Sequence, residues 1–327
     1  MMWSSRRGDS ATTMPKVLTL ATGRIRDRWH SRRTAWQLYV LMIVPLAYLL
    51  VFRYYPMLGA QIAFREYSVR GGIWGSQWVG LRHFGRFLDS YLFFRILRNT
   101  LILSFYQLVA GFPLPILLAL SLKYVGSVRY RKTVQMVTYA PYFISTVVIV
   151  GMLFRLLSMH NGLVNNFLGL IGSDRVNFLG SSALFPHVYV WSGVWQHVGY
   201  GSIIYMAALS GVDPELHEAA IVDGASIIQR IRHIDIPGIL PTAVIILILS
   251  TGLIMEVGFE KAFLMQNPLN LRTSEIIDTY VYKIGLQSPL PQFSYAAAIG
   301  LFRSAVGLAL LATVNAVSRR VTESSLW

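Results

Sequence analysis

The chain has 327 residues, of which 54% are hydrophobic and only 13% are charged, and its mean hydropathy is +0.50. Soluble domains carry charge at about 25% of positions, so an ordinary soluble domain is excluded. Cysteine is absent, which also excludes disulfides, thiol catalysis and cysteine-ligated metals. The net charge of +14 indicates either basic cytoplasmic loops that orient a membrane protein or an anionic substrate or partner.

Residues 1–35 are polar and rich in Lys and Arg, which is typical of a basic cytoplasmic tail. The arginine pair after Ser31 faintly resembles a twin-arginine signal. The apolar run that follows is too long for a cleaved signal peptide, and no convincing small-x-small site follows it. We therefore expect an uncleaved first helix.

Six apolar stretches are long enough to cross a bilayer, which takes roughly 18 residues. Backbone polar groups must be paired in lipid, so each stretch is expected to be a helix. Residues 36–320 are thus predicted to form an all-α, polytopic inner-membrane domain, followed by a cytoplasmic C-terminus at 321–327. The predicted spans are 36–55, 100–122, 134–157, 184–210, 241–259 and 295–317. Neighbouring helices are expected to make the internal prolines tolerable; these are Pro45, Pro113, Pro115 and Pro141.

The segments that this arrangement places in the cytoplasm are denser in Lys and Arg than the external ones, which predicts that both termini are cytoplasmic. Segment 56–99 is an exception, because it is external in this topology yet holds six Arg against Glu66 and Asp89. An anionic oligosaccharide, an acidic face of a partner or anionic lipid headgroups would each explain this charge. Within the segment, residues 81–100 are expected to form an amphipathic helix at the membrane interface.

The polar insert at 211–240 lies between two apolar stretches and has strong local signals. Asp213 followed by Pro214 predicts a helix start, with Asp as the N-cap and Pro at the first helical position. Asp223-Gly224 is expected to end this short helix, because glycine adopts the left-handed turn without strain.

A second helix is expected after the glycine turn, with one apolar face formed by Ile227, Ile228, Ile231 and Ile234. Pro237 and Pro241 are expected to end it at the membrane entry. The resulting helix–turn–helix, on the cytoplasmic side of the predicted topology, suits docking into a groove on a partner. A merely solvated connector is the simpler alternative.

The spacing of this insert resembles the EAA loop of permease subunits in binding-protein-dependent ABC importers, which have the MetI-like permease fold. The resemblance rests on Glu218-Ala219-Ala220, on Asp223-Gly224, and on Ile234 and Pro237, with nine residues between Gly224 and Ile234. It implies that the loop, between the fourth and fifth spans, is a coupling helix seated in a cleft of a cytoplasmic ATPase. Glu218 would face basic groups there, Ala219 and Ala220 would permit close packing, and Gly224 would make the turn.

Further motifs resemble a branch of these permeases that imports oligosaccharides, including alginate, pectin-fragment and LplB-like permeases. They are GLRHFGRFL at 80–88, RNTL at 98–101, GFEKAFLMQNPLN at 258–270, IDTYVYKIGL at 277–286 and the final VSRRVTESSLW. The resemblance implies a second permease subunit, two ATP-binding subunits that hold ATP and Mg, and a periplasmic or extracellular solute-binding protein. It also implies a membrane lipid environment, an oligosaccharide substrate that we expect to be acidic and alginate-like, no cofactor in this chain and no nucleic acid.

Two charged residues stand out within the predicted spans, where charges usually face a bundle interior or an aqueous path. Glu256 and Arg303 are expected at similar depth, so they could pair as a clamp between adjacent helices. Alternatively, Arg303 could meet a sugar carboxylate, or either side chain could snorkel to the outer interface.

The fourth predicted span carries polar and aromatic residues that could bind sugar rings by stacking and hydrogen bonding. The simpler interpretation is helix packing and an interfacial aromatic belt. The candidate substrate-pathway residues in this span are Trp191, Trp195, Gln196, His197 and Tyr200. Close helix contact is expected at Gly193, Gly199 and Gly201.

Two functions other than an oligosaccharide importer permease are considered for this sequence. A membrane-embedded enzyme would need converging acids or a metal set, whereas Glu256 is the only acid evident within the predicted spans, and Ile221 stands where an HExxH zinc motif needs its second histidine. No Gly-Lys dipeptide occurs, which excludes a Walker A phosphate loop. A permease of the same superfamily for a neutral sugar or another solute is the second rival.

Overall fold

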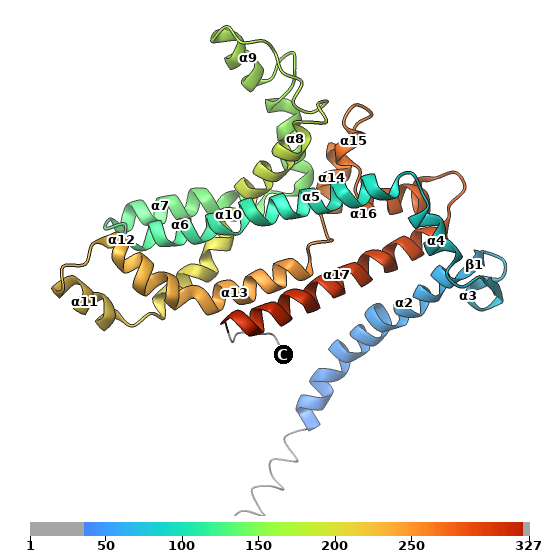
Figure 1. Ribbon diagram of the computed structural model, residues 1–327, viewed down its shortest axis with the longest axis horizontal. Coiled ribbons are helices and arrows are strands. Elements are labelled where there is room, and N and C mark those ends of the chain that lie inside the picture. Colours follow the sequence, from blue (N-terminus) through green and yellow to red (C-terminus); the bar gives the residue numbers. More distant parts are fainter. Residues whose placement is uncertain (1–35, 323–327) are drawn as a thin grey trace, which may run out of the picture. The chain divides into compact units, whose positions relative to one another are not determined.

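The computed structural model describes residues 36–322, with side chains as far as residue 319. The predicted tail at 1–35 and most of the predicted C-terminal segment at 321–327 lie outside the described residues. The chain divides into two units, and the boundary between them in the sequence follows Ala60. Both are mainly helical (Figure 1).

The described part of the first unit, residues 36–60, is a single apolar helix that continues into the start of the second unit. Residues 36–49 are α-helical, and the helix runs on through a π-helical turn without stopping at Pro45. Its later parts are η1 (Leu50–Tyr54), α2 (Tyr55–Met57) and the 3-10 helix η2 (Leu58–Phe64). The whole stretch Trp36–Phe64 is long and apolar enough to cross a membrane, so the first span is longer than the predicted 36–55.

The second unit opens with a small antiparallel hairpin that an all-α prediction does not include. Strands β1 (Arg65–Ser68) and β2 (Ser76–Trp78) pair Arg65 with Trp78, and α3 (Gly72–Gly75) lies between them. Helix α4 (Arg82–Leu88) follows. The expected interfacial helix at 81–100 is therefore broken after α4, and its second half belongs to α5 (Phe93–Gly111).

The second and third predicted spans differ from the structure in their bounds and in their straightness. Helices α5 and α6 (Pro113–Lys123) form one span, which begins seven residues before the predicted one. Helix α7 (Val128–Tyr139) continues into η3 (Ala140–Phe143), and α8 (Thr146–Leu156) follows at an angle of 102° after a break at residues 144–145. The predicted third span is therefore not one straight helix, because Ser145 starts a new helix by accepting a hydrogen bond from the Val148 amide.

Helix α10 (Phe185–Ser210) matches the predicted fourth span, and α9 (Leu163–Leu170) precedes it. A Cβ atom added at Gly199 would collide with the carbonyl of Thr138, so this glycine permits the close approach of α7 and α10 that we expected. The remaining elements are α11 (Pro214–Val222), α12 (Ile227–Arg230), η4 (Ile231–Asp235), α13 (Ile236–Gly252), α14 (Phe259–Met265), α15 (Leu271–Ser274), α16 (Ile277–Tyr282), η5 (Lys283–Gln287) and α17 (Phe293–Thr322).

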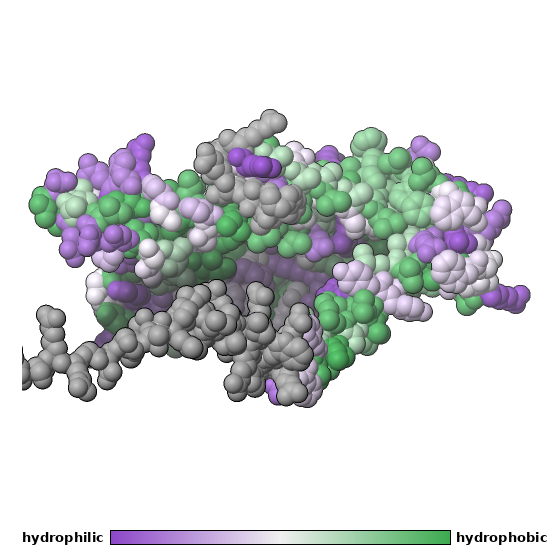
Figure 2. All heavy atoms as spheres, turned by 90° about the horizontal axis from the view of Figure 1, so that it is seen from below, coloured by the Kyte–Doolittle hydropathy of each residue, from purple (hydrophilic) through white to green (hydrophobic). Residues whose placement is uncertain are grey.

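Four helices of the described chain are long and apolar enough to cross a membrane, or five if the bent pair α7–α8 is one span. Helix α10 is long but is not among them. The expected count of six spans therefore stays a prediction. On the face shown in Figure 2, hydrophobic side chains cover much of the surface, as a lipid-facing protein requires.

Three buried clusters hold the second unit together. One joins α5, α8, α10 and α14 around Tyr189 and Met265. A second joins α4, α5, α16 and α17 around Phe87 and Ile299. The third joins α6, α10 and α13 around Tyr205. Together they fix α10, α13, α14 and α17, the elements that carry the candidate site.

Candidate functional site

The insert folds locally as its residues predict. Asp213 caps α11 by accepting a hydrogen bond from the Glu215 amide at 2.9 Å. Gly224 follows the helix with a φ of +74°, and the amides of Gly224 and Ala225 bond back to the carbonyls of Ile221 and Ala220. These two bonds are those of a Schellman cap, which needs a left-handed residue at the glycine position.

The second helix of the insert is longer than expected. Ser226 and Gln229 form a capping box at its start, and it then continues as α12, η4 and α13 to Gly252. The expectation that Pro237 and Pro241 end this helix is wrong. Just before Pro237, the Ile236 amide bonds to the Ile231 carbonyl in a π-helical pattern, which widens the turn that the proline ring follows.

Figure 1 shows α11 and α12 at one end of the second unit, away from β1 and α4. Glu218, Ala219, Asp223 and Pro237 are exposed. Ala220 and Ile234 are half-buried. The insert also exposes several large apolar side chains, namely Leu216, Ile221, Val222, Ile227 and Ile228. This mixed surface fits a docking element, although the coupling roles themselves stay predictions.

A buried carboxylate ties the insert to the membrane helices. Asp235 of η4 is fully buried, and its Oδ1 lies 2.5 Å from Lys123 Nζ at the end of α6 and 3.2 Å from His217 Nε2 of α11. Its Oδ2 accepts a hydrogen bond from Tyr124 at 2.7 Å. Burial, helped by this bond to the carboxylate, raises the pKa of Tyr124 to about 12, so the phenol remains a donor. Motion of α11 is therefore linked directly to α6 and α13.

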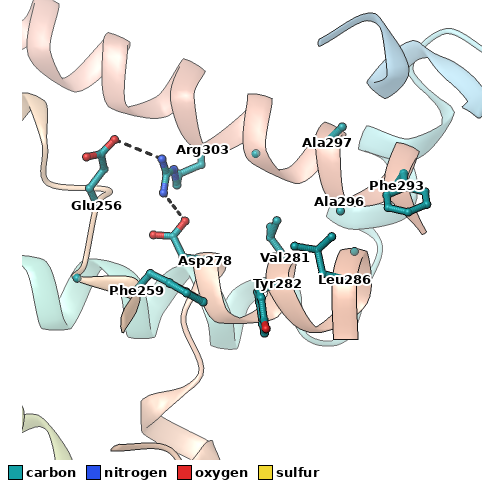
Figure 3. Close-up of a pocket in the computed structure, with 13 residues that line it drawn as sticks. Glu256, Phe259, Asp278, Val281, Tyr282, Leu286, Phe293, Ala296, Ala297 and Arg303 are labelled. Carbon is teal, nitrogen blue, oxygen red and sulfur yellow. Dashed lines mark hydrogen bonds and ion pairs between the residues drawn. The ribbon is translucent and has the colours of Figure 1, made fainter. Parts of the chain in front are cut away.

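A pocket of about 780 Å³ lies between α16 and α17, beside the chain between α13 and α14. Arg303 of α17 extends into it and pairs with Glu256 at 3.3 Å, as expected, and also with Asp278 of α16 (Figure 3). Glu256 was predicted to lie within a spanning helix, and this is wrong, because α13 ends at Gly252. One guanidinium thus faces two carboxylates, and Arg303 is already neutralised within the chain.

Two further pockets adjoin this one. The α10–α13 pocket, of about 530 Å³, shares Glu256 with it and includes His197. The α10–α14 pocket, of about 310 Å³, shares Gly258 and Phe259 with the first, and shares His197 and Gln107 with the second. The three pockets therefore meet around residues 256–259, where the chain is non-helical between α13 and α14.

The candidate residues of α10 do not share one surface. Trp191 and Trp195 are about half exposed and line a separate apolar pocket with residues of α8. Tyr200 stacks on Tyr142 with ring centroids 3.8 Å apart. Gln196 and His197 instead line the α10–α14 pocket, where Gln196 donates to the Ile144 carbonyl at 3.1 Å. Their substrate roles stay predictions.

The sequence reasoning missed three charged residues near these features: Asp278, Lys261 and Asp235. Asp278 and Lys261 stand within motifs that carry the family resemblance, but the predicted topology places segment 260–294 outside the membrane spans. Asp235 lies within the insert, yet its partners Lys123 and Tyr124 are more than 100 residues away. A search for acids near the ends of predicted helices would have drawn attention to Asp235.

Four arginines of the basic segment 56–99 make contacts within the fold. Arg65 lies over the rings of Trp74 and Trp78, and Arg86 lies 4.4 Å from the ring centroid of Tyr295. Arg82 pairs with Glu66 at 3.3 Å and Arg95 pairs with Glu275 at 2.8 Å. Much of this positive charge therefore has a structural partner, which weakens its use as evidence for an anionic substrate.

Comparison with known proteins places this arrangement in context. Residues 84–323 match the family described as the binding-protein-dependent transport system inner membrane component. The chain is 41% identical over 290 residues to the polygalacturonan/rhamnogalacturonan transport system permease protein YteP of Bacillus subtilis, covering 89% of this chain and 90% of that protein. It is 36% identical to protein LplB of the same organism, covering 98% of both chains.

Comparison with solved structures agrees with this family and identifies the fold. A chain of a bacterial ABC transporter involved in the import of the acidic polysaccharide alginate superposes with a TM-score of 0.83 at 40% identity, covering 90% of this chain and 99% of that one. A bacterial alginate ABC transporter in complex with an alginate pentasaccharide-bound periplasmic protein gives a TM-score of 0.83 at 39% identity, covering 91% and 99%. The described helices therefore adopt a known permease fold.

Proposed function

Because this chain belongs to the family of binding-protein-dependent transport system inner membrane components, we propose that it forms half of the membrane pathway of an ATP-driven importer for an acidic oligosaccharide. The observation that carries the proposal is the match to the alginate transporter over 90% of the chain. The related proteins are transport permeases and not enzymes, so this chain is a transport subunit of the membrane.

The proposed partners follow from what the related systems contain. A second permease subunit would complete the pathway, and a solute-binding protein outside the bacterial inner membrane would deliver the sugar, as the periplasmic protein in the alginate complex suggests. Two ATP-binding subunits would hold ATP and Mg. Both termini and the insert, with the tail at 1–35 and the C-terminus at 321–327, would face the cytoplasm.

In the proposed mechanism the insert transmits ATPase movement to the membrane helices. Glu218, Ala219 and the exposed apolar residues of α11 and α12 would dock in a cleft of an ATPase subunit. The contacts of Asp235 with Lys123 and His217 support this role, because they connect α11 to α6 and α13 without a flexible linker. The helices would then alternate between inward-open and outward-open arrangements as rigid bodies.

An acidic substrate is supported by the alginate and polygalacturonan transporters among the relatives. One observation favours a neutral sugar instead: Arg303 is neutralised by Glu256 and Asp278, so among the described residues the α16–α17 pocket has no unpaired cation. A neutral oligosaccharide is therefore the second candidate.

The test is ATP-dependent uptake by the complete complex in proteoliposomes. Uptake of an acidic uronate oligosaccharide is compared with uptake of the same oligosaccharide after its carboxyl groups are reduced to alcohols. We expect preference for the acidic sugar. Preference for the reduced sugar would support the second candidate, and uptake of neither would contradict an oligosaccharide importer.

A further inference from the structure

Lys261 is a buried cation that the described residues leave without a counter-charge. It stands on α14 and is 8% exposed. Its Nζ donates to the backbone carbonyl of Tyr189 at 2.9 Å and lies 4.9 Å from the centroid of that ring. In the described part of the chain, no carboxylate oxygen lies within 4.0 Å of Nζ, so the charge meets only a carbonyl dipole and an aromatic ring.

This arrangement is unfavourable for folding. A buried ammonium group costs free energy unless it is paired, and Lys261 uses one of its three donors on a carbonyl. Burial lowers the pKa of Lys261 to about 8, so the group is still mostly charged at neutral pH. A stabilising role for the charge therefore does not explain its position, whereas an incoming anion would.

The surroundings of Lys261 fit one unit of a sugar chain. It lines the α10–α14 pocket, whose volume of about 310 Å³ is at the lower limit of roughly 300 Å³ for ligand pockets. Phe259 and Tyr189 supply aromatic rings. Polar side chains that can hydrogen-bond to hydroxyls are supplied by Gln107, Thr146, Gln196 and His197.

Two neighbouring features favour access to the ammonium group. A Cβ atom added at Gly193 would lie 3.2 Å from Nζ, so the absence of a side chain there leaves room beside the charge. Glu260 also lines the pocket, but it is exposed and does not pair with Lys261. Among the lysines and arginines that line the three adjoining pockets, Lys261 is the one without a carboxylate partner, since Arg303 has two.

We propose that Lys261, rather than Arg303, binds the carboxylate of an acidic sugar unit as the oligosaccharide passes the break between α13 and α14. The inference rests on the proposed importer function and names the group that would recognise its acidic substrate. The remaining N–H donors of the ammonium group would bond the carboxylate, while the amide and imidazole groups opposite would bond hydroxyls.

The experiment uses the complete transporter complex in proteoliposomes with three variants of this chain. Lys261→Gln removes the charge and keeps a polar side chain of similar length, and Lys261→Arg keeps the charge. Lys132→Gln removes a charge from an exposed lysine on α7 as a matched control. Uptake of a uronate oligosaccharide and of its carboxyl-reduced form is measured with binding protein in excess, together with the thermal unfolding midpoint of each complex.

We expect Lys261→Gln to lower uptake of the acidic sugar by roughly tenfold, the effect of losing one hydrogen bond to a charged group, and to change uptake of the reduced sugar little. Lys261→Arg should retain most acidic uptake, and Lys132→Gln all of it. The unfolding midpoint of Lys261→Gln should not fall. Unchanged acidic uptake in Lys261→Gln, or an equal loss for both sugars, would overturn the inference. Failure of the unmodified complex to import the acidic sugar would instead contradict the proposed function.

Discussion

At the scale of single residues, Arg303 shows how the chemistry of a charge depends on partners from other elements. On α17 it is the only charged residue between Phe293 and Ser318, within an apolar run. In the fold it lies between a carboxylate from α16 and another from the chain after α13. A guanidinium held in this way connects α17 to α16 and to the chain after α13. This agrees with the interpretation of Arg303 as a clamp between helices, which the sequence also allowed.

Arg303→Ala should therefore destabilise the chain and lower transport without regard to substrate charge. It leaves Asp278 facing Glu256 with no cation, and loss of one partner of a buried pair costs roughly 3–5 kcal/mol, less here because Glu256 is exposed. We expect a loss of about 2 kcal/mol in unfolding free energy, measured by denaturation in detergent. The double variant Arg303→Ala/Asp278→Asn should recover about half of it.

The matching transport measurement separates a clamp from a ligand-binding group. Arg303→Ala should lower uptake of acidic and carboxyl-reduced oligosaccharide by the same factor. A loss restricted to the acidic sugar would show that Arg303 contacts a carboxylate, against the arrangement seen here.

At the scale of elements, the insert behaves as two helices whose relative direction is set by one residue. Gly224 has a positive φ, and nothing lies within 4 Å of a Cβ atom added there. A substitution is therefore opposed by backbone conformation and not by crowding. Because α11 is also joined to Asp235 through His217, a changed turn would pull on the buried network at the end of α6.

Gly224→Val should uncouple ATP hydrolysis from uptake while leaving the subunit in the membrane. The left-handed conformation costs an L-residue roughly 1–2 kcal/mol, and more for a β-branched one, so the turn should open. We expect roughly a tenfold fall in sugar imported per ATP hydrolysed, measured in proteoliposomes. Gly224→Asn is the matched control, since Asn tolerates this conformation, and it should stay near the unmodified ratio. Normal coupling in the valine variant would refute the role of the turn.

At the scale of the whole molecule, the chain has the features expected of one subunit of a larger complex. Its exposed surface includes many large apolar side chains beyond those of the insert, among them Trp191 and Trp195 of α10. Lipid or a second permease subunit would cover such surfaces. Its sequence contains no Walker A motif, which agrees with the proposal that separate subunits bind ATP.

The purified chain alone should accordingly hydrolyse no ATP above the rate of a protein-free blank. Hydrolysis should appear when the ATP-binding subunits are added, and should disappear again when the phosphate-loop lysine of those subunits is replaced. Activity that follows this polypeptide through purification would contradict the assignment of ATP binding to partners. The measurement is phosphate release in detergent and in proteoliposomes.

The sequence alone determined the features that depend on neighbouring residues. Long apolar runs predicted the positions of the four helices that are long and apolar enough to cross a membrane, because hydropathy is a local property. Asp213 with Pro214, and Asp223 with Gly224, fixed both ends of α11, because capping involves groups within a few residues of the helix end. The family resemblance, carried by the same short motifs, is confirmed by the match over residues 84–323.

Only the tertiary structure decided how distant segments meet. The bend between η3 and α8, the continuous helix through Pro237 and the end of α13 before Glu256 depend on how neighbouring groups accommodate the backbone. The partners of Arg303 and Asp235, and the isolation of Lys261, depend on side chains brought together from separate helices. A charge in an apolar run can be recognised from sequence, but whether it is paired or left for a ligand is settled by packing.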